Sequence, residues 1–220
     1  VASSTTVFLL SLAALWFGCS NSIREIVAEW AIYHRERMVN LRISPYIGSK
    51  FTVLGGLCLV QCLVLLTIVH WGNQLEGPWL GMLVVLVLVS LVGLSIGLMI
   101  SAVVRTSEVA IAVLPLILLP MVILGGVLQP LEKMSAPMRL SANMMPSRWA
   151  FESMLLMESE KRELHTPPAV PGVEAPVERD VAEQFFPKDE YRTSVTAGVF
   201  TLTAMLVIAV LVSAAILRRR

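Results

Sequence analysis

The stretch NSIREIVAEWAIYHRERMVNLRISPYIGSK, residues 21–50, separates two apolar segments and organises the rest of the chain. Ser22-x-x-Glu25 has the spacing of a capping box, in which two side chains satisfy the free amides at a helix start. The apolar residues recur at i, i+3, i+4 and i+7 and form one stripe: Ile23, Ile26, Val27 and Trp30. Ser44-Pro45 ends the pattern, because proline disfavours helical geometry in the preceding residue. These features predict an amphipathic helix over residues 22–37, between two membrane spans.

Two roles fit such a helix. As an interfacial loop helix, it would anchor the chain at the lipid surface. As a lever, it would pass force from a partner protein into the membrane spans on either side. The amphipathic pattern alone leaves both roles open.

The composition is that of a membrane protein. Of the 220 residues, 56% are hydrophobic and 15% are charged, and the mean hydropathy is +0.75. A soluble domain carries about 25% charged residues. Here charge is missing from blocks of about 20 residues, the length that crosses a bilayer as a helix. We therefore predict an all-α, polytopic membrane protein, and the net charge of +1 gives no reason to expect a nucleic-acid partner.

Five apolar segments are long enough to be spans, at about residues 5–20, 46–71, 79–104, 109–128 and 195–217. Lys and Arg in short loops mark the cytoplasmic side. This rule places the 22–37 helix, the Arg105 turn and the C-terminal Arg218-Arg219-Arg220 inside. It places residues 72–78 and the extracytoplasmic segment 129–193 outside. The N-terminus would then lie outside, and we expect one further span before Val1.

The chain shows little site chemistry. Gly48-Ser49-Lys50 lacks the upstream glycine of a phosphate-binding loop. Cys58 and Cys62 lie at i and i+4 on one helix face. A metal pair is conceivable there, but small core residues fit better because no His or third Cys is near. We predict no catalytic residue, no metal site and no cofactor in this segment.

Two intramembrane patterns each allow a structural and a functional interpretation. Gly93-x-x-x-Gly97, followed by Ser101, forms a small-residue stripe that lets helices approach closely. Packing inside one subunit explains it more simply than a dimer seam does. Pro115 and Pro120 interrupt the span 109–128, either as passive kinks or as parts of a span that changes shape.

Four groups of residues carry a family resemblance. Arg24-Glu25, Tyr33-His34-Arg35-Glu36, Asn40-Leu41 and Tyr46-x-x-Ser49-Lys50 resemble the segment after the second span of ABC-2 type membrane domains, above all the G subfamily of ABC transporters and its bacterial relatives. Pro130 and MPSRWAFE, residues 145–152, resemble that family's outer segment between its fifth and sixth spans. The resemblance covers essentially the whole chain. The outer loop lacks the cysteines that eukaryotic members use for disulfides, which favours a bacterial origin.

The resemblance implies an architecture. Members have six spans per half, so residues 1–220 would be one ABC-2 type transmembrane domain that lacks the first span and the ATPase domain. Residues 22–37 would be the coupling helix resting on that ATPase domain, with contacts from Arg24, Glu25, Glu29, Arg35 and Glu36. The substrate path would lie between two halves and be lined by Phe8, Leu12, Trp16, Pro115, Pro120, Met121 and Leu124.

The resemblance also implies a function. The chain would be the permease part of an ATP-driven ABC transporter that exports an amphipathic or lipid-like substrate by alternating access. ATP and Mg would bind to the partner ATPase domain, and the other partners would be a second transmembrane half, as a homodimer, and membrane lipid. The location would be the bacterial inner membrane, with a cytoplasmic C-terminus. The alternatives are a non-transporting scaffold or sensor, and a secondary transporter, which normally needs ionisable groups inside its spans.

Overall fold

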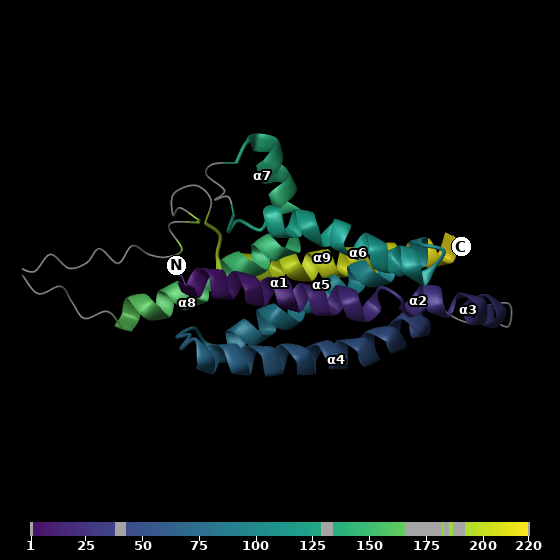
Figure 1. Ribbon diagram of the computed structural model, residues 1–220, viewed down its shortest axis with the longest axis horizontal. Coiled ribbons are helices and arrows are strands. Elements are labelled where there is room, and N and C mark those ends of the chain that lie inside the picture. The colour runs from purple at the N-terminus through teal and green to yellow at the C-terminus, as the bar shows by residue number, and fades with distance from the viewer. Residues whose placement is uncertain are drawn as a thin grey trace, which may run out of the picture.

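The computed structural model describes residues 2–37, 43–128, 134–165, 182, 185–186 and 192–219. These residues form helices and connecting turns, with no strand among them. The helices are α1 (Ala2–Ser22), α2 (Glu25–Ala28), α3 (Trp30–Arg37), α4 (Ile43–Gly72), α5 (Trp79–Val103), α6 (Ser107–Ile123), α7 (Ala136–Asn143), α8 (Pro146–His165) and α9 (Val195–Arg219). They form an elongated bundle, with α2, α3 and the C-terminus at one end (Figure 1). The predicted all-α class is confirmed.

Four helices are long and apolar enough to cross a membrane: α4, α5, α9 and the helical stretch that contains α1. They cover the segments expected at 46–71, 79–104, 195–217 and 5–20. The fifth expected span, 109–128, corresponds to α6, whose 17 residues make a helix of about 25 Å. A hydrocarbon core of about 30 Å is longer than that. The protein is an integral membrane protein, and α6 by itself is shorter than such a core.

The C-terminal end of α6 is hydrogen-bonded to α8. The Ser147 hydroxyl donates a 2.7 Å hydrogen bond to the Met121 carbonyl, one of the last four carbonyls of α6. Gly126 follows with φ of 97°, a left-handed conformation that glycine adopts without steric cost. The helix ends at Ile123, just before the Gly125-Gly126 pair, rather than at residue 128.

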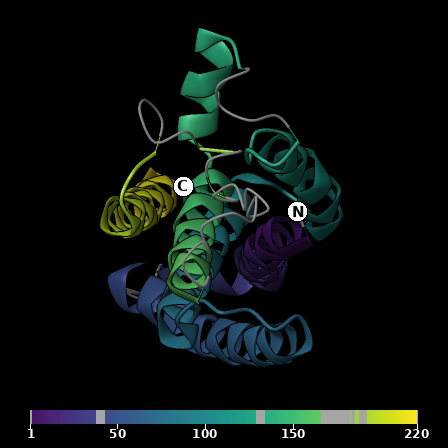
Figure 2. The same cartoon turned by 90° about the vertical axis from the view of Figure 1, so that its left-hand side faces the viewer.

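Helix α5 is the centre of the bundle and packs against α1, α4, α8 and α9. When the bundle is viewed along its long axis, α8 lies between α1 and α9, and α4 lies on the opposite side of the bundle from α6 (Figure 2). The α1–α5 contact is built on small residues. A Cβ on Gly18 would lie 2.6 Å from the Leu94 amide, and one on Gly97 would lie 2.8 Å from the Cys19 carbonyl. The interpretation of Gly93-x-x-x-Gly97 as packing inside one subunit is confirmed.

The described part of the segment 129–193 contains two helices, one packed on the bundle and one standing away from it. Pro146 begins α8, and the residues from 146 to 159 are buried against the bundle except Trp149, which is half-buried. Helix α7 stands away from the bundle (Figure 1), and its Leu140 is 67% exposed. Residues 165–178 are rich in proline, which predicts a flexible loop, but His165 ends α8 and residues 166–178 lie outside the described residues.

Candidate coupling site

The predicted helix 22–37 is two helices, and the predicted capping box is wrong. Ser22 ends α1, and its hydroxyl donates to the Gly18 carbonyl at 2.8 Å instead of capping a new helix. The residue before α2 is Arg24, which makes no side-chain cap. The chain bends again at Glu29, where α3 follows. Helix α1 thus continues almost directly into α2, because its buried face is kept in contact with α5.

A hydroxyl on α5 holds the start of α2. The backbone amides of Ile26 and Val27 each donate a 3.0 Å hydrogen bond to Ser101 Oγ. Both amides lie in the first turn of a helix, where they have no intrahelical acceptor. Ile23, Ile26 and Val27 are buried, so the apolar stripe predicted from the sequence faces the bundle. Movement of α2 therefore requires movement of α5 or loss of these two hydrogen bonds.

Tyrosines attach α3 to α9 and α4. Tyr33 is 1% exposed, and its hydroxyl donates to the Leu217 carbonyl of α9 at 3.3 Å. The Tyr33 ring centroid lies 5.6 Å from that of Trp30 and 5.1 Å from that of Tyr46 on α4. These rings belong to a hydrophobic cluster of their own at this end of the bundle. Aromatic contacts of this kind contribute roughly 0.5–1.5 kcal/mol beyond burial.

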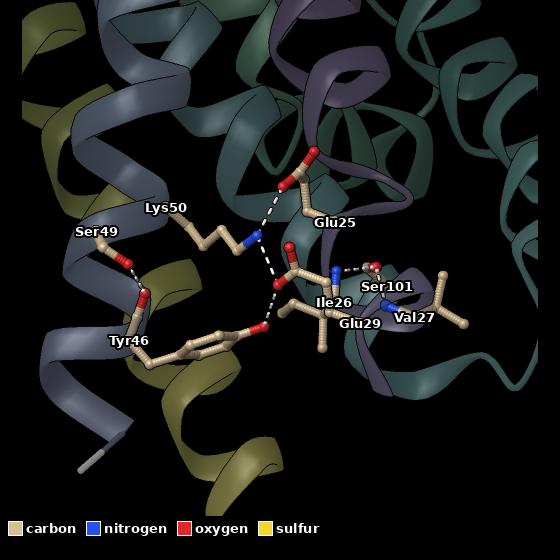
Figure 3. A network of polar contacts seen from close by, with 8 residues as sticks. All are labelled: Glu25, Ile26, Val27, Glu29, Tyr46, Ser49, Lys50 and Ser101. Carbon is tan, nitrogen blue, oxygen red and sulfur yellow. Dashed lines mark hydrogen bonds and ion pairs between the residues drawn. The ribbon is translucent and has the colours of Figure 1, made fainter. Parts of the chain in front are cut away.

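Lys50 on α4 joins the two acidic residues of the α2 region. Its Nζ lies 2.9 Å from Glu25 Oε2 and 2.7 Å from Glu29 Oε2 (Figure 3). The Tyr46 hydroxyl donates to the same Glu29 oxygen at 3.4 Å. The Lys50 side chain is 16% exposed, against 34% for Glu25 and 44% for Glu29. We call Lys50, Glu25 and Glu29 together the Lys50 bridge.

The five residues expected to face an ATPase domain therefore separate into groups. Glu25 and Glu29 point toward Lys50 of the same chain (Figure 3). Arg24 and Arg35 are exposed and lie on the outer side of α2 and α3. Glu36 belongs to α3, but its side chain lies outside the described residues.

Sequence reasoning did not assign roles to Lys50, Tyr46, Tyr33 and Ser101. One signal was available for Lys50, because a lysine close to the start of an apolar span needs a counter-charge nearby. The acidic residues at positions 25 and 29 are spaced i and i+4, which would place both carboxylates on one face of a continuous helix. The contacts of Tyr33 and Ser101 depend on tertiary packing that no local pattern in the sequence indicates.

The candidate path residues also fall into two groups. Phe8 and Met121 are buried inside the chain, with the Phe8 ring 5.4 Å from that of Phe151 on α8. Leu12 is partly buried and packs against the same core. Trp16 is 47% exposed, Pro115 and Pro120 are exposed on α6, and Leu124 caps its end and is partly exposed. The exposed members lie on α1 and α6, which contact each other.

Buried charges on α8 tie the opposite end of the bundle together. Arg148 and Glu152 pair at 3.2 Å, with side chains 4% and 1% exposed. Glu152 Oε1 accepts a 2.7 Å hydrogen bond from the Thr193 amide just before α9. Glu158 Oε2 accepts hydrogen bonds from the Gly77 and Glu76 amides, at 2.8 and 3.1 Å. Burial lowers the pKa of the Arg148 guanidinium, and the Glu152 carboxylate opposes that shift.

The cysteines are core residues. Cys58 and Cys62 are fully buried on α4, and the Cys62 thiol donates to the Leu86 carbonyl of α5 at 3.7 Å. Among the residues that the structure describes, no group of three or more His, Cys, Asp or Glu could hold a metal ion. At the α2–α3 end, charged, aromatic and hydroxyl side chains connect the two short helices to α4, α5 and α9.

Comparison with known proteins matches this architecture. The sequence profile of the family described as "ABC-2 type transporter" matches residues 3–158, which include α1 to α6 and most of α8. The chain is 26% identical over 151 residues to the "ABC transporter ATP-binding/permease protein Rv1747" of Mycobacterium tuberculosis (strain ATCC 25618 / H37Rv). The matched part is 65% of this chain and 17% of that relative's length. The family profile covers well over half of the chain, from α1 through α2 and α3 and into α8, and the chain belongs to the ABC-2 type transporter family.

Proposed function

We propose that this chain is the membrane-spanning permease part of an ATP-driven ABC transporter that exports an amphipathic or lipid-like substrate by alternating access. The observation that carries the proposal is the α2–α3 end. Arg24 and Arg35 are exposed at these two short helices. An ion pair attaches the helices to α4, and hydrogen bonds attach them to α5 and α9. A domain that pushes on α2 and α3 would therefore move three membrane helices together.

The proposal also names an energy source and partners. ATP and Mg bind to an ABC ATPase domain, which docks on the exposed side of α2 and α3. A second transmembrane half, a copy of this chain, completes the path. The relative from M. tuberculosis is described as an ATP-binding and permease protein, which supports this pairing. The membrane is a bacterial inner membrane, with α2, α3 and the C-terminus on the cytoplasmic side.

The path runs between the two halves along α1 and α6. Trp16, Pro115, Pro120 and Leu124 supply its surface, because they are exposed or partly exposed in the single chain. Phe8, Leu12 and Met121 support that surface from behind. The prolines remove backbone hydrogen bonds within α6 and lower the cost of bending it. The spans carry no ionisable residue in their central parts, so an apolar or amphipathic cargo suits them better than an ion.

Reconstitution tests this function. The full transporter, with its ATPase domain, is placed in proteoliposomes that contain a fluorescent phospholipid analogue as the transport probe. We expect ATP to drive movement of the analogue from one leaflet to the other, measured by loss of its accessibility to an external quencher. A catalytically inactive ATPase domain should abolish the movement. ATP hydrolysis without movement of the analogue or of other amphipathic probes would favour a non-transporting sensor instead.

A further inference from the structure

The attachments of α2 and α3 to the three long helices differ in kind. The link to α5 uses two backbone amides on Ser101, and the link to α9 uses the buried Tyr33 hydroxyl. The link to α4 has the Lys50 bridge as its charged part. Tyr46 of α4 adds a ring contact and a long hydrogen bond. The α4 link therefore depends most on side-chain charge.

Helix α4 buries much less of its surface in the bundle than the central helix α5 does, although α9 buries still less, at 11%. In its apolar stretch, 22% of the residues are buried inside the chain, against 61% for α5. Its outer face exposes large apolar residues such as Val53, Val60 and Ile68 to the surroundings. Little side-chain packing therefore prevents α4 from tilting relative to α5. Whether α4 follows α2 and α3 is decided largely at its Lys50 end.

The Lys50 bridge suits this task. The Lys50 Nζ lies within 3 Å of oxygens from both Glu25 and Glu29, one at each end of α2. A pair made to two carboxylates restricts the lysine more than a single surface pair does, and the site is sheltered from solvent on the lysine side. Lys50 also lies 5.9 Å from the Tyr46 ring centroid, which is within range of a cation–π contact.

We propose that Lys50 is a positioning residue that makes α4 move with α2 and α3, so that force from the ATPase domain reaches this span. The proposal rests on the proposed function for its role in transport, while the bridge itself can be tested without any partner. Glu25 and Glu29 act within the chain in this account. Arg24 and Arg35 are left to face the ATPase domain.

The first test measures the α3–α4 distance on the chain in nanodiscs. Spin labels are placed at the exposed positions Ala31 and Thr52 after the three native cysteines are replaced. We expect a narrow distance distribution in the native background, a broader one in Lys50→Met, and a narrow one in Lys50→Arg. The double variant Lys50→Glu with Glu29→Lys exchanges the two charges and should again give a narrow distance distribution. An unchanged distribution in Lys50→Met would overturn the proposal. Ser49→Ala, next to Lys50 and exposed, is the matched control and should change nothing.

The second test measures transport per ATP hydrolysed in the full transporter. Lys50→Met should lower this ratio about fivefold or more, the lower range of coupling between sites, while ATP hydrolysis continues. Lys50→Arg should restore the ratio, which a loss of folding would not allow. A broadened distance with an unchanged ratio would also overturn the proposal. If the native protein moves no amphipathic probe, the proposed function fails, and the distance measurement still decides whether the bridge exists.

Discussion

Replacing Gly18 with alanine is expected to destabilise the folded bundle by about 3 kcal/mol or more, the upper range for overpacking a core. A Cβ there would overlap the Ser90 carbonyl oxygen and lie 2.6 Å from the Leu94 amide. Both are backbone atoms of α5, so no side chain can rotate away. The whole of α1 would have to shift from α5, and the contacts of α2 would shift with it. Gly93→Ala should act in the same way, through the Leu15 carbonyl.

The midpoint of unfolding in mixed detergent micelles measures this effect. Gly56→Ala is the matched control, because Gly56 lies within α4 and a Cβ there meets nothing within 4 Å. That variant should stay within about 1 kcal/mol of native, as helix propensity alone requires. If Gly18→Ala and Gly56→Ala have the same midpoint, the close α1–α5 packing described here is incorrect.

Arg148→Met is expected to cost about 3–5 kcal/mol, because it leaves the buried Glu152 carboxylate without its cationic partner. Glu152 would retain the Thr193 amide as a donor, which is too little to compensate a charge at 1% exposure. The start of α9 is held by that same carboxylate. We therefore expect loosening at the junction of α8 and α9, measured as faster amide hydrogen exchange at residues 193–198.

The double variant Arg148→Met with Glu152→Gln separates charge pairing from shape. The glutamine still has an oxygen to accept the Thr193 amide, and no charge is left buried alone. Its stability should therefore exceed that of Arg148→Met, with the difference read from the same unfolding midpoints. A double variant that is less stable than the single one would show that Glu152 is not paired mainly with Arg148.

The class of fold could be predicted because it depends on properties that are local in sequence. Blocks of about 20 apolar residues must be helical in lipid, and the helical periodicity of Ile23, Ile26 and Val27 placed their buried face correctly. The close helix packing at the small-residue stripe on α5 could also be predicted, since Gly93 and Gly97 permit close approach of any neighbouring helix.

Other features depended on contacts between distant parts of the chain. Ser22-x-x-Glu25 matched a capping box, but packing on α5 kept Ser22 inside α1, where its hydroxyl bonds to Gly18. Pro45 was expected to stop a helix, yet it lies in the first turn of α4, where its missing amide costs nothing. Glu25 and Glu29 looked free to meet a partner. Lys50, 21 residues beyond Glu29, pairs with both of them.

The central claim is that α2 and α3 couple ATP hydrolysis to transport, and charge reversal on their exposed side tests it most directly. In the full transporter in proteoliposomes, ATP hydrolysis and movement of the fluorescent phospholipid are measured together for Arg35→Glu and for Arg24→Glu, both at exposed positions. Gly48→Ala is the control, because Gly48 is exposed on α4 and its Cβ would meet nothing within 4 Å. We predict normal insertion, since exposed substitutions change stability by about 0.5 kcal/mol. We also predict that transport per ATP falls at least about fivefold in both charge-reversal variants and stays native in the control. Native ratios of transport to hydrolysis in both charge-reversal variants would contradict the account.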